Sequence, residues 1–286
     1  MKKLGIDIGG TAIKIGYFNH NNLICCKRYT GIDSLESFTA LLNHKDIVDF
    51  ADNDFAGVGI GVPGVVGDNR VQSCPNISWL EDANIISLVA KRFGDNLKYA
   101  IDNDANLAAY GEAKSGAGCG HSNFAFITVG TGIGGGLIIN DKIFHGPGGM
   151  AGEIGHLSSC HSLACNCGAT GCVEAIASAS NIEHRAGGTP LPEIITVAAN
   201  GDERATKLIK ESGNAIGETI AQIALLLDIR VFIFGGGGAP CIESWRPYIN
   251  EVIDLRCFGR SASDFSIIQA SLGNDAGVCG AAALIT

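Results

Sequence analysis

Apolar and polar positions alternate along the first part of the chain in a way typical of β-strands. Residues 4–8 form a short apolar run that ends in the turn Gly9-Gly10-Thr11, and the residues from Ile13 to Tyr17 then alternate. A period of two indicates a strand, so the glycine turn is expected to join two strands of a hairpin. A third strand is expected at Leu23–Tyr29.

The rest of the chain switches repeatedly between helical and extended patterns. The spacing of apolar residues predicts helices at 34–50, with Ser34 as a suitable N-cap, and at 84–93, 105–114, 174–185, 191–200, 203–227, 241–255 and from 275 onwards. Short apolar runs predict strands at 58–62, 99–101, 124–129, 136–139, 231–234 and 265–269. This alternation of strands and helices predicts an α/β fold.

The arrangement of strand, glycine turn and strand at residues 4–18 occurs again at 124–140, around the glycine-rich stretch 130–135. The two segments share little sequence, so the repeat is one of structure. A dinucleotide-binding fold needs a helix directly after its glycines, because the helix N-terminus binds the pyrophosphate. Since a strand pattern follows both turns, that fold and the oxidoreductase it would support are disfavoured.

Composition narrows the class of protein. Forty of the 286 residues are glycine, about twice the usual ~7%, while 46% hydrophobic and 17% charged residues exclude a disordered chain. No stretch reaches the ~18 apolar residues of a membrane span, and a net charge of −9 disfavours nucleic-acid binding. Eleven cysteines without a signal-peptide pattern indicate a cytoplasmic protein with reduced thiols, some of which are candidates for a metal site.

The glycine turns are candidate phosphate sites. Glycines at a hairpin tip let backbone amides approach an anion, and Asp7, just before the first turn, could hold Mg²⁺ against it. A simple tight turn with an exposed carboxylate explains the pattern equally well. A third cluster, Gly235–Gly238, lies between a strand and a helix, where it could contact adenine or form an ordinary turn.

A polar cluster, Asp102-Asn103-Asp104-Ala105-Asn106, lies where a predicted strand meets a predicted helix. A carboxylate there can act as general base toward a hydroxyl group. Aspartate and asparagine are also common N-caps. Two acids and two amides exceed what one cap needs, which favours a functional role.

Four potential soft ligands lie close together in the sequence: His156, Cys165, Cys167 and Cys172. One histidine with three cysteines suits tetrahedral zinc, and the alternative is a loop of free thiols around a core histidine. Cys160 and His161 are competing ligands. Glu153 and Glu174 flank this segment and could accept hydrogen bonds from sugar hydroxyls or lie on the solvated surface.

The order of these motifs resembles that of the ROK family of bacterial sugar kinases, within the actin/hexokinase/Hsp70-like ATPase superfamily. The motifs that carry the resemblance are Asp7 to Thr11, Asp102 to Asn106, Gly130 to Gly136, Glu153 to His156, Cys165 to Cys172 with Glu174, Gly235 to Gly237, and Asp275 to Gly277. The resemblance implies a two-lobed, actin-like (ribonuclease H-like) α/β fold with a duplicated βββαβα core and a zinc-binding loop. It places 1–104 and 275–286 in a small lobe and 105–274 in a large lobe.

The resemblance also implies roles for individual residues. Asp104 matches the catalytic base, and Asn103, Asp104, Glu153, His156 and Glu174 match the sugar-binding positions, with Gly64 and Asn76 in a segment that reads hydroxyls. The Mg²⁺ and ATP sites would comprise Asp7, Gly9, Gly10, Thr11, Gly130, Thr131, Gly132, Gly134, Gly235, Gly236 and Gly237. Structural Zn²⁺ would bind His156, Cys165, Cys167 and Cys172. Many relatives have lysine where this chain has Ala12, and Lys14 could substitute for it.

The activity implied is ATP-dependent phosphorylation of a hexose at its 6-hydroxyl by a cytoplasmic homodimer. Glucose is the favoured substrate. N-acetylmannosamine comes next, and N-acetylglucosamine or fructose are further alternatives within the family. A sugar-sensing regulator is disfavoured, because such relatives carry a DNA-binding segment before the first hairpin, which here begins at Leu4.

Overall fold

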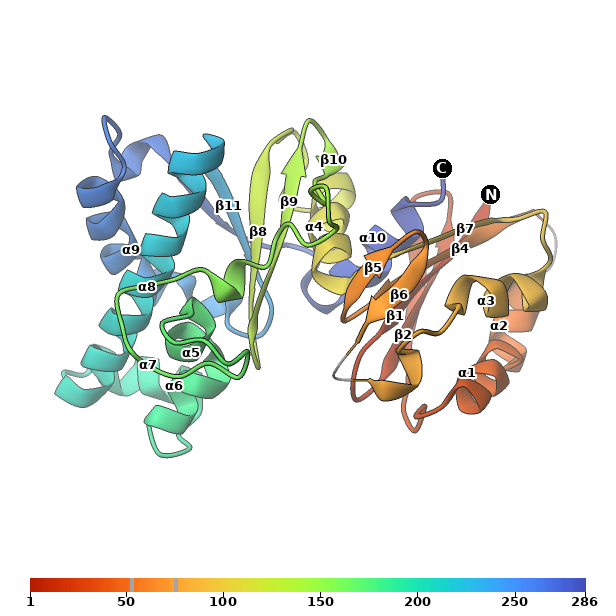
Figure 1. Cartoon of the computed structure of the whole chain (residues 1–286), viewed down its shortest axis with the longest axis horizontal. Helices are drawn as coiled ribbons and strands as arrows, with labels where there is room; N and C mark the ends of the chain where they lie inside the picture. The colour runs from red at the N-terminus through yellow and green to blue at the C-terminus, as the bar shows by residue number, and fades with distance from the viewer. Residues whose placement is uncertain (52–53, 75–76) are drawn as a thin grey trace. The chain divides into compact units, whose positions relative to one another are not determined.

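The computed structural model describes residues 1–51, 54–74 and 77–286, which form two compact units (Figure 1). The first unit comprises Met1–Gly120, Lys142–Ala151 and Asn274–Thr286, and the second comprises His121–Asp141 and Gly152–Gly273. This division differs from the sequence-based boundary after residue 104, because helix α4 (Asp104–Ser115) packs closely on α10 (Ala276–Ala283) of the first unit. A Cβ atom added to Gly280 would lie 1.8 Å from the carbonyl oxygen of Leu107.

The first unit is built on a mixed five-stranded sheet. Its strands, in sheet order, are β3 (Asn22–Tyr29), β2 (Ile13–Asn19), β1 (Lys2–Ile8), β4 (Phe55–Val62) and β7 (Lys98–Asn103). The first three strands are antiparallel, and β4 and β7 run parallel to β1. Leu4, Ile6 and Ile8 of β1 are fully buried in the core, so the expected glycine hairpin at 4–18 is confirmed.

The first unit also contains three α-helices, a short helix, a hairpin and a short strand. These are α1 (Leu35–Leu42), α2 (Lys45–Phe50), α3 (Ile85–Phe93), η1 (Ser78–Leu80), the hairpin of β5 (Val65–Gly67) and β6 (Arg70–Ser73), and β10 (Lys142–Ile143). The single helix expected at 34–50 is wrong, although Ser34 does cap its start. The break occurs because His44 is extended and its ring accepts the amide of Asp46, which caps a new helix.

The second unit repeats the strand order of the first. Its strands follow the order β9 (Ile133–Ile139), β8 (Phe124–Val129), β11 (Val231–Gly235) and β12 (Ser266–Gln269), which corresponds to β2-β1-β4-β7. Strands β8 and β9 are antiparallel, and β11 and β12 run parallel to β8. The chain is therefore an α/β protein with a duplicated mixed sheet. Because β9 begins at Ile133, the second glycine turn is shorter than the predicted 130–135.

The helices of the second unit are η2 (Ile154–His156), α5 (Val173–Ala177), α6 (Ala179–Arg185), α7 (Leu191–Ala199), α8 (Glu203–Leu227), η3 (Ala239–Cys241), α9 (Ile242–Arg256) and η4 (Ala262–Asp264), and η5 (Gly273–Asp275) leads back to the first unit. The helix expected at 174–185 is wrong at Ser178, which is extended and caps α6 with its hydroxyl oxygen. Trp245 is fully buried and donates its indole hydrogen to Ser212, which joins α9 to α8. None of the described helices is long and apolar enough to cross a membrane.

Candidate functional site

Polar side chains meet at the carboxyl ends of the parallel strands β1, β4 and β7. The sheet register places Asp7 beside Gly61 and Gly61 beside Asp102, and the next pair is Val62 with Asn103. Ligands of open α/β sheets usually bind at this edge. The fold therefore brings the first Asp motif and the Asp-Asn-Asp cluster to one edge of one sheet, although almost a hundred residues separate them.

Asn103 and Asp104 form the start of helix α4. The side-chain oxygen of Asn103 accepts the amides of Ala105 (2.9 Å) and Asn106 (3.2 Å), so Asn103 is the N-cap. Its amide nitrogen donates to the carbonyl oxygen of Gly64 (3.1 Å). Asp104 is consequently the first helical residue, where the helix dipole favours a negative charge. Asn76, which is expected with Gly64 in the segment that reads sugar hydroxyls, lies outside the described residues.

Asp102 has a supporting role that its sequence neighbours do not share. Its buried carboxylate accepts the backbone amide of Asn103 (2.7 Å) and the side chain of Asn106 (3.2 Å), and its other oxygen lies 2.7 Å from Nε2 of His145. The pair with His145 ties the segment Lys142–Ala151 to the end of β7. Sequence reasoning missed His145, because 43 residues separate it from Asp102 and it belongs to no motif.

Asp7 lies between the first hairpin and the start of α10. Burial raises the pKa of its carboxyl group, and the nearby ammonium of Lys14 opposes that rise. The Lys14 nitrogen is 3.7 Å from the Asp7 carboxylate and donates to the carbonyl oxygen of Asn274 (2.9 Å). A Cβ atom on Gly277 would lie 2.9 Å from the same carboxylate, so the terminal Asp-Ala-Gly motif allows α10 to approach Asp7.

The first glycine turn is closed by one backbone hydrogen bond. The amide of Gly9 donates to the carbonyl oxygen of Ala12 (3.0 Å), and Gly9, Gly10 and Thr11 are exposed. A Cβ atom on Gly10 would meet no atom within 4 Å. The fold therefore leaves open space above this turn, as backbone contact with a phosphate group requires.

In the second unit, the other two glycine segments lie against each other. The amide of Gly238 donates to the carbonyl oxygen of Val129 (2.8 Å), and a Cβ atom on Gly236, at φ +78°, would lie 2.5 Å from the same oxygen. Packing therefore requires glycine at 236. At Gly130 and Gly237 a Cβ atom would meet nothing within 4 Å, so the space beside them is open to a ligand.

The other residues of the glycine segments that are predicted to bind ATP lie in different structural environments. Thr131 is exposed in the turn, Gly134 lies inside β9 opposite Thr128, and Gly235 ends β11 with the ring of Phe126 against it. Gly134 is therefore part of a strand rather than of the turn to which the sequence pattern assigned it.

Glu174 holds the second glycine turn in place. Its carboxylate accepts the amide of Ile133 (2.9 Å), and a Cβ atom on Gly132 would lie 2.4 Å from the same oxygen. Helix η2 packs on Ile133, because a Cβ atom on Gly155 would lie 2.1 Å from the carbonyl oxygen of Ile133. Glu153 and His156, one turn apart on either side of Gly155, are both exposed.

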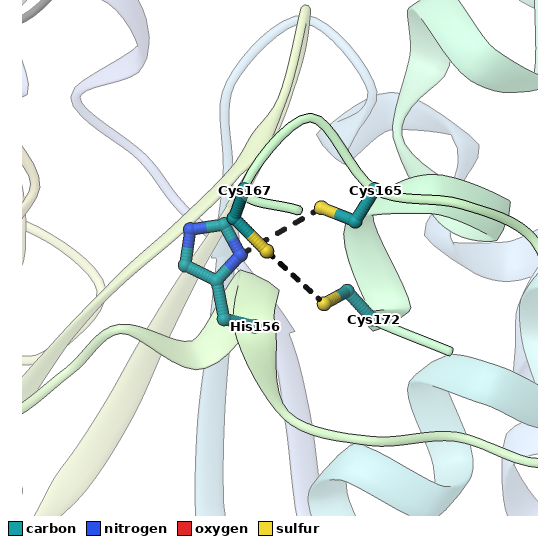
Figure 2. A group of neighbouring side chains, drawn as sticks. All are labelled: His156, Cys165, Cys167 and Cys172. Atoms are coloured by element: carbon teal, nitrogen blue, oxygen red, sulfur yellow. Dashed lines mark hydrogen bonds between the residues drawn. The ribbon is translucent and has the colours of Figure 1, made fainter. Parts of the chain in front are cut away.

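Four potential ligand side chains, from η2 and the loop that leads to α5, point toward one another (Figure 2). The ligand atoms of His156, Cys165, Cys167 and Cys172 all lie within 4.8 Å of one another. Nδ1 of His156 is 3.9 Å from the Cys165 sulfur, and the sulfurs of Cys167 and Cys172 are 3.6 Å apart. Ligands of tetrahedral zinc, with bonds of about 2.0–2.3 Å, lie roughly 3.3–3.8 Å apart, so the donor set and its spacing fit zinc.

The thiols of this cluster differ in acidity. Burial, together with the neighbouring thiols, raises the pKa of Cys172 to about 12, whereas a hydrogen bond from the backbone of Ala169 lowers that of exposed Cys167. Metals bind the thiolate form, so loading this cluster would release protons.

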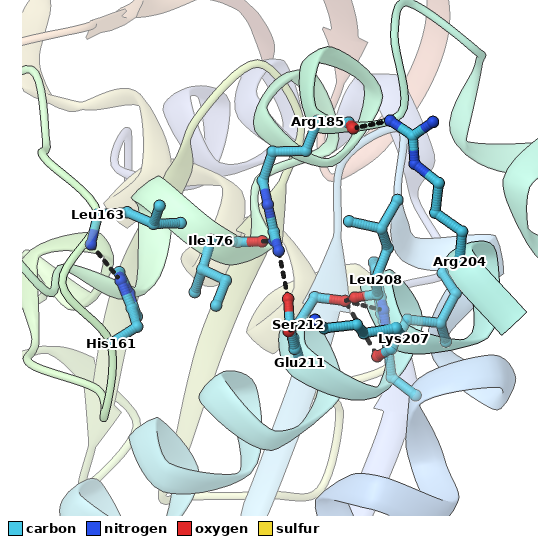
Figure 3. A network of polar contacts seen from close by, with 11 residues as sticks. His161, Leu163, Ile176, Arg185, Arg204, Lys207, Leu208, Glu211 and Ser212 are labelled. Carbon is cyan, nitrogen blue, oxygen red and sulfur yellow. Dashed lines mark hydrogen bonds and ion pairs between the residues drawn. The ribbon is translucent and has the colours of Figure 1, made fainter.

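The two competing ligands, Cys160 and His161, lie outside the cluster. Figure 3 shows the amide of Leu163 donating to Nδ1 of His161 (3.1 Å), and Nε2 of the same ring lies 3.1 Å from the carbonyl oxygen of Cys172. Both ring nitrogens are therefore engaged. The Cys160 sulfur accepts a hydrogen bond from Arg256 (3.7 Å). In the same region, an ion pair between Arg185 and Glu211 joins α6 to α8.

Comparison with known proteins places this arrangement in a family. The model of the ROK family matches residues 3–286. The chain belongs to the ROK family. It is 31% identical to a glucokinase from Halalkalibacterium halodurans over 315 residues, covering 99% of this chain and 94% of the relative. It is 29% identical to an N-acetylmannosamine kinase from Yersinia pestis over 297 residues, covering 98% and 97%.

The solved structure of a relative supports the same family and fold for this ROK protein. A ROK family glucokinase from Streptomyces griseus, in complex with glucose and AMPPNP, is 30% identical, with a TM-score of 0.77 and coverage of 100% of this chain and 99% of the other. The predicted family and its α/β fold are thus confirmed.

Proposed function

We propose that this ROK protein transfers the γ-phosphoryl group of ATP to the 6-hydroxyl of a hexose, with glucose as the preferred sugar. The observation that carries the proposal is the placement of Asp104 at the start of α4, beside the sheet edge where Asp7 also lies. The full-length match to the family and the glucokinase relatives support the same reading.

In the proposed reaction, Asp104 accepts the proton of the 6-hydroxyl as its oxygen attacks the γ-phosphorus. A bond forms between the sugar oxygen and phosphorus, and the bond from phosphorus to the bridging oxygen of ADP breaks. Such catalysis depends mainly on positioning and charge neutralisation. Asp7 would hold Mg²⁺, which neutralises phosphate charge, and the glycine segments would place backbone amides against the phosphates and adenosine.

Sugar hydroxyls would bind Asn103, Glu153, His156 and Glu174. One oxygen of Glu174 accepts the amide of Ile133, which would fix the carboxylate while its other oxygen receives a hydroxyl. His156 would use Nδ1, the nitrogen nearest Cys165, for zinc and Nε2 for the sugar. Zinc would in this way hold η2 and the start of α5 together, and with them Glu153 and Glu174.

The test is ADP release by the purified protein with ATP, Mg²⁺ and a panel of glucose, N-acetylmannosamine, N-acetylglucosamine and fructose. We expect glucose to give the highest kcat/KM. A higher value for N-acetylmannosamine would instead support the second candidate, which its 29% identity to such a kinase favours. Absence of turnover with every sugar would contradict a kinase.

Lys14 gives a separate prediction about ATP. Replacing it with Ala is expected to raise KM for ATP about tenfold, the effect of losing one charge-assisted contact of ~1.5 kcal/mol, with KM for the sugar unchanged. The ammonium of Lys14 opposes the burial-induced rise in the Asp7 pKa, so without it that pKa rises further. The acid limb of the pH–rate profile should therefore move to higher pH. Lys27→Ala on β3 is the control, and an unchanged ATP dependence would contradict the role.

We also propose that the protein acts in the cytoplasm as a homodimer. The family resemblance supports the dimer. The large apolar side chains of Leu226, Leu255 and Phe258 are each more than four-fifths exposed, which is apolar area that self-association would bury.

A further inference from the structure

A pocket of about 220 Å³ lies in the first unit, at the far end of β1 from Asp7. Its walls include Lys3 of β1, Tyr110 and Lys114 of α4, and Ala282 and Ala283 of α10. Lys3 and Asp7 are four residues apart on one strand, so they lie on one face of the sheet at a separation of about 13 Å. The pocket is therefore distinct from the candidate phosphate site.

Lys3 is an unusual residue for this position. Its exposure is only 8%, and among the described residues it forms no hydrogen bond or ion pair. Burial lowers the pKa of Lys3, and the like charge of Lys98 lowers it further. The buried part of Lys3 is its aliphatic stem, whereas its ammonium is not among the fully buried polar atoms of the described residues and is therefore open to the pocket.

The rest of the pocket also favours a negative ligand. Within the described part of the chain, no aspartate or glutamate lines it. Lys114 is exposed and lies 4.8 Å from the ring centre of Tyr110, which places a second cation at the wall. The hydroxyl groups of Tyr110 and Ser115 are potential donors. A main-chain oxygen of Thr286, another lining residue, already accepts a hydrogen bond from Lys98.

We propose that this pocket binds a small anion whose phosphate or carboxylate group pairs with the ammonium of Lys3. The cavity of about 220 Å³ has room for one such group on a short body. Lysine binds phosphate as a compact point charge. The ligand supplies a counterion, which none of the described residues gives Lys3.

The test is a titration of the full-length protein with inorganic phosphate and, separately, with acetate at constant ionic strength. Binding is followed by the ¹³C-methyl signals of Ala282 and Ala283, which line this pocket and not the nucleotide site. We expect saturable shifts in the wild type and at least tenfold weaker binding in Lys3→Met, which keeps the side-chain length. The neighbouring variant Lys2→Met, whose ammonium lies over the ring of Phe50, should bind as the wild type does.

A response to phosphate alone would identify a phosphorylated ligand, and a response to acetate a carboxylate. Ala283→Phe keeps Lys3 but fills the pocket, so it should also weaken binding, as seen at Ala282, even if Lys3→Met does not fold. Equal shifts in the wild type and both variants, or no saturable shift in the wild type, would overturn the proposal. Sugar-dependent ADP release is a separate readout and does not bear on this outcome.

Discussion

Asp104→Asn is expected to lower kcat for the sugar by about 10²–10⁴-fold, the usual contribution of a general base, while sugar affinity stays close to that of the wild type. Asparagine preserves the shape of the side chain and can still accept the amide of Ala105, which Asp104 now accepts at 2.8 Å. It cannot take up the proton of the attacking hydroxyl. Turnover is measured by ADP release and sugar binding by titration calorimetry.

The matched control is Asp95→Asn, an exposed aspartate in the loop before β7, which should retain wild-type turnover. If Asp104→Asn retains wild-type kcat, Asp104 is not the base. If sugar binding is lost together with turnover, Asp104 acts mainly by binding the sugar. The separation of kcat from affinity is therefore the result that identifies a base.

The fold could be predicted largely from periodicity. The period of two after each glycine turn predicted the two hairpins, which β2 and β9 confirm. The helix breaks could not be predicted. In each case one residue, His44 or Ser178, has an extended backbone conformation, although the apolar pattern around it is that of a continuous helix. The hairpin β5–β6 was also missed, because its strands of three and four residues are too short to show a period.

The candidate site was less accessible to sequence reasoning, because adjacent carboxylates look alike in a sequence. Asp102 and Asp104 occupy equivalent places in their motif, yet Asp102 is buried against His145 while Asp104 begins α4. Only the register of β7 and the path of a segment 43 residues away separate these roles. The hydrogen bond between Glu174 and Ile133 was hidden for the same reason, since it joins α5 to the first residue of β9, 41 residues away in sequence.

Cys172→Ser is expected to remove the proposed zinc and to lower the melting temperature. Cys172 is buried and precedes α5, and the amide of Val173 beside it donates to the carbonyl oxygen of Leu157 next to His156 (2.9 Å). Structural zinc contributes an apparent binding free energy of ~10 kcal/mol. A loss of only about 3 kcal/mol of stability would lower the melting temperature by roughly 10 °C, at ~2–4 °C per kcal/mol. Metal analysis should find about one zinc per wild-type chain and almost none in the variant.

The control is Cys160→Ser, in the same loop but outside the four-residue cluster, which should keep the metal and the wild-type melting temperature. Wild-type protein that binds no zinc, or a Cys172→Ser variant that binds it equally well, would contradict the site. The kinetics of the folded variant distinguish a zinc ion that positions the sugar-binding residues from one that only stabilises the fold. Zinc would hold Glu153, His156 and Glu174, whereas Asp104 belongs to the first unit, so folded Cys172→Ser protein should show a larger rise in sugar KM than fall in kcat.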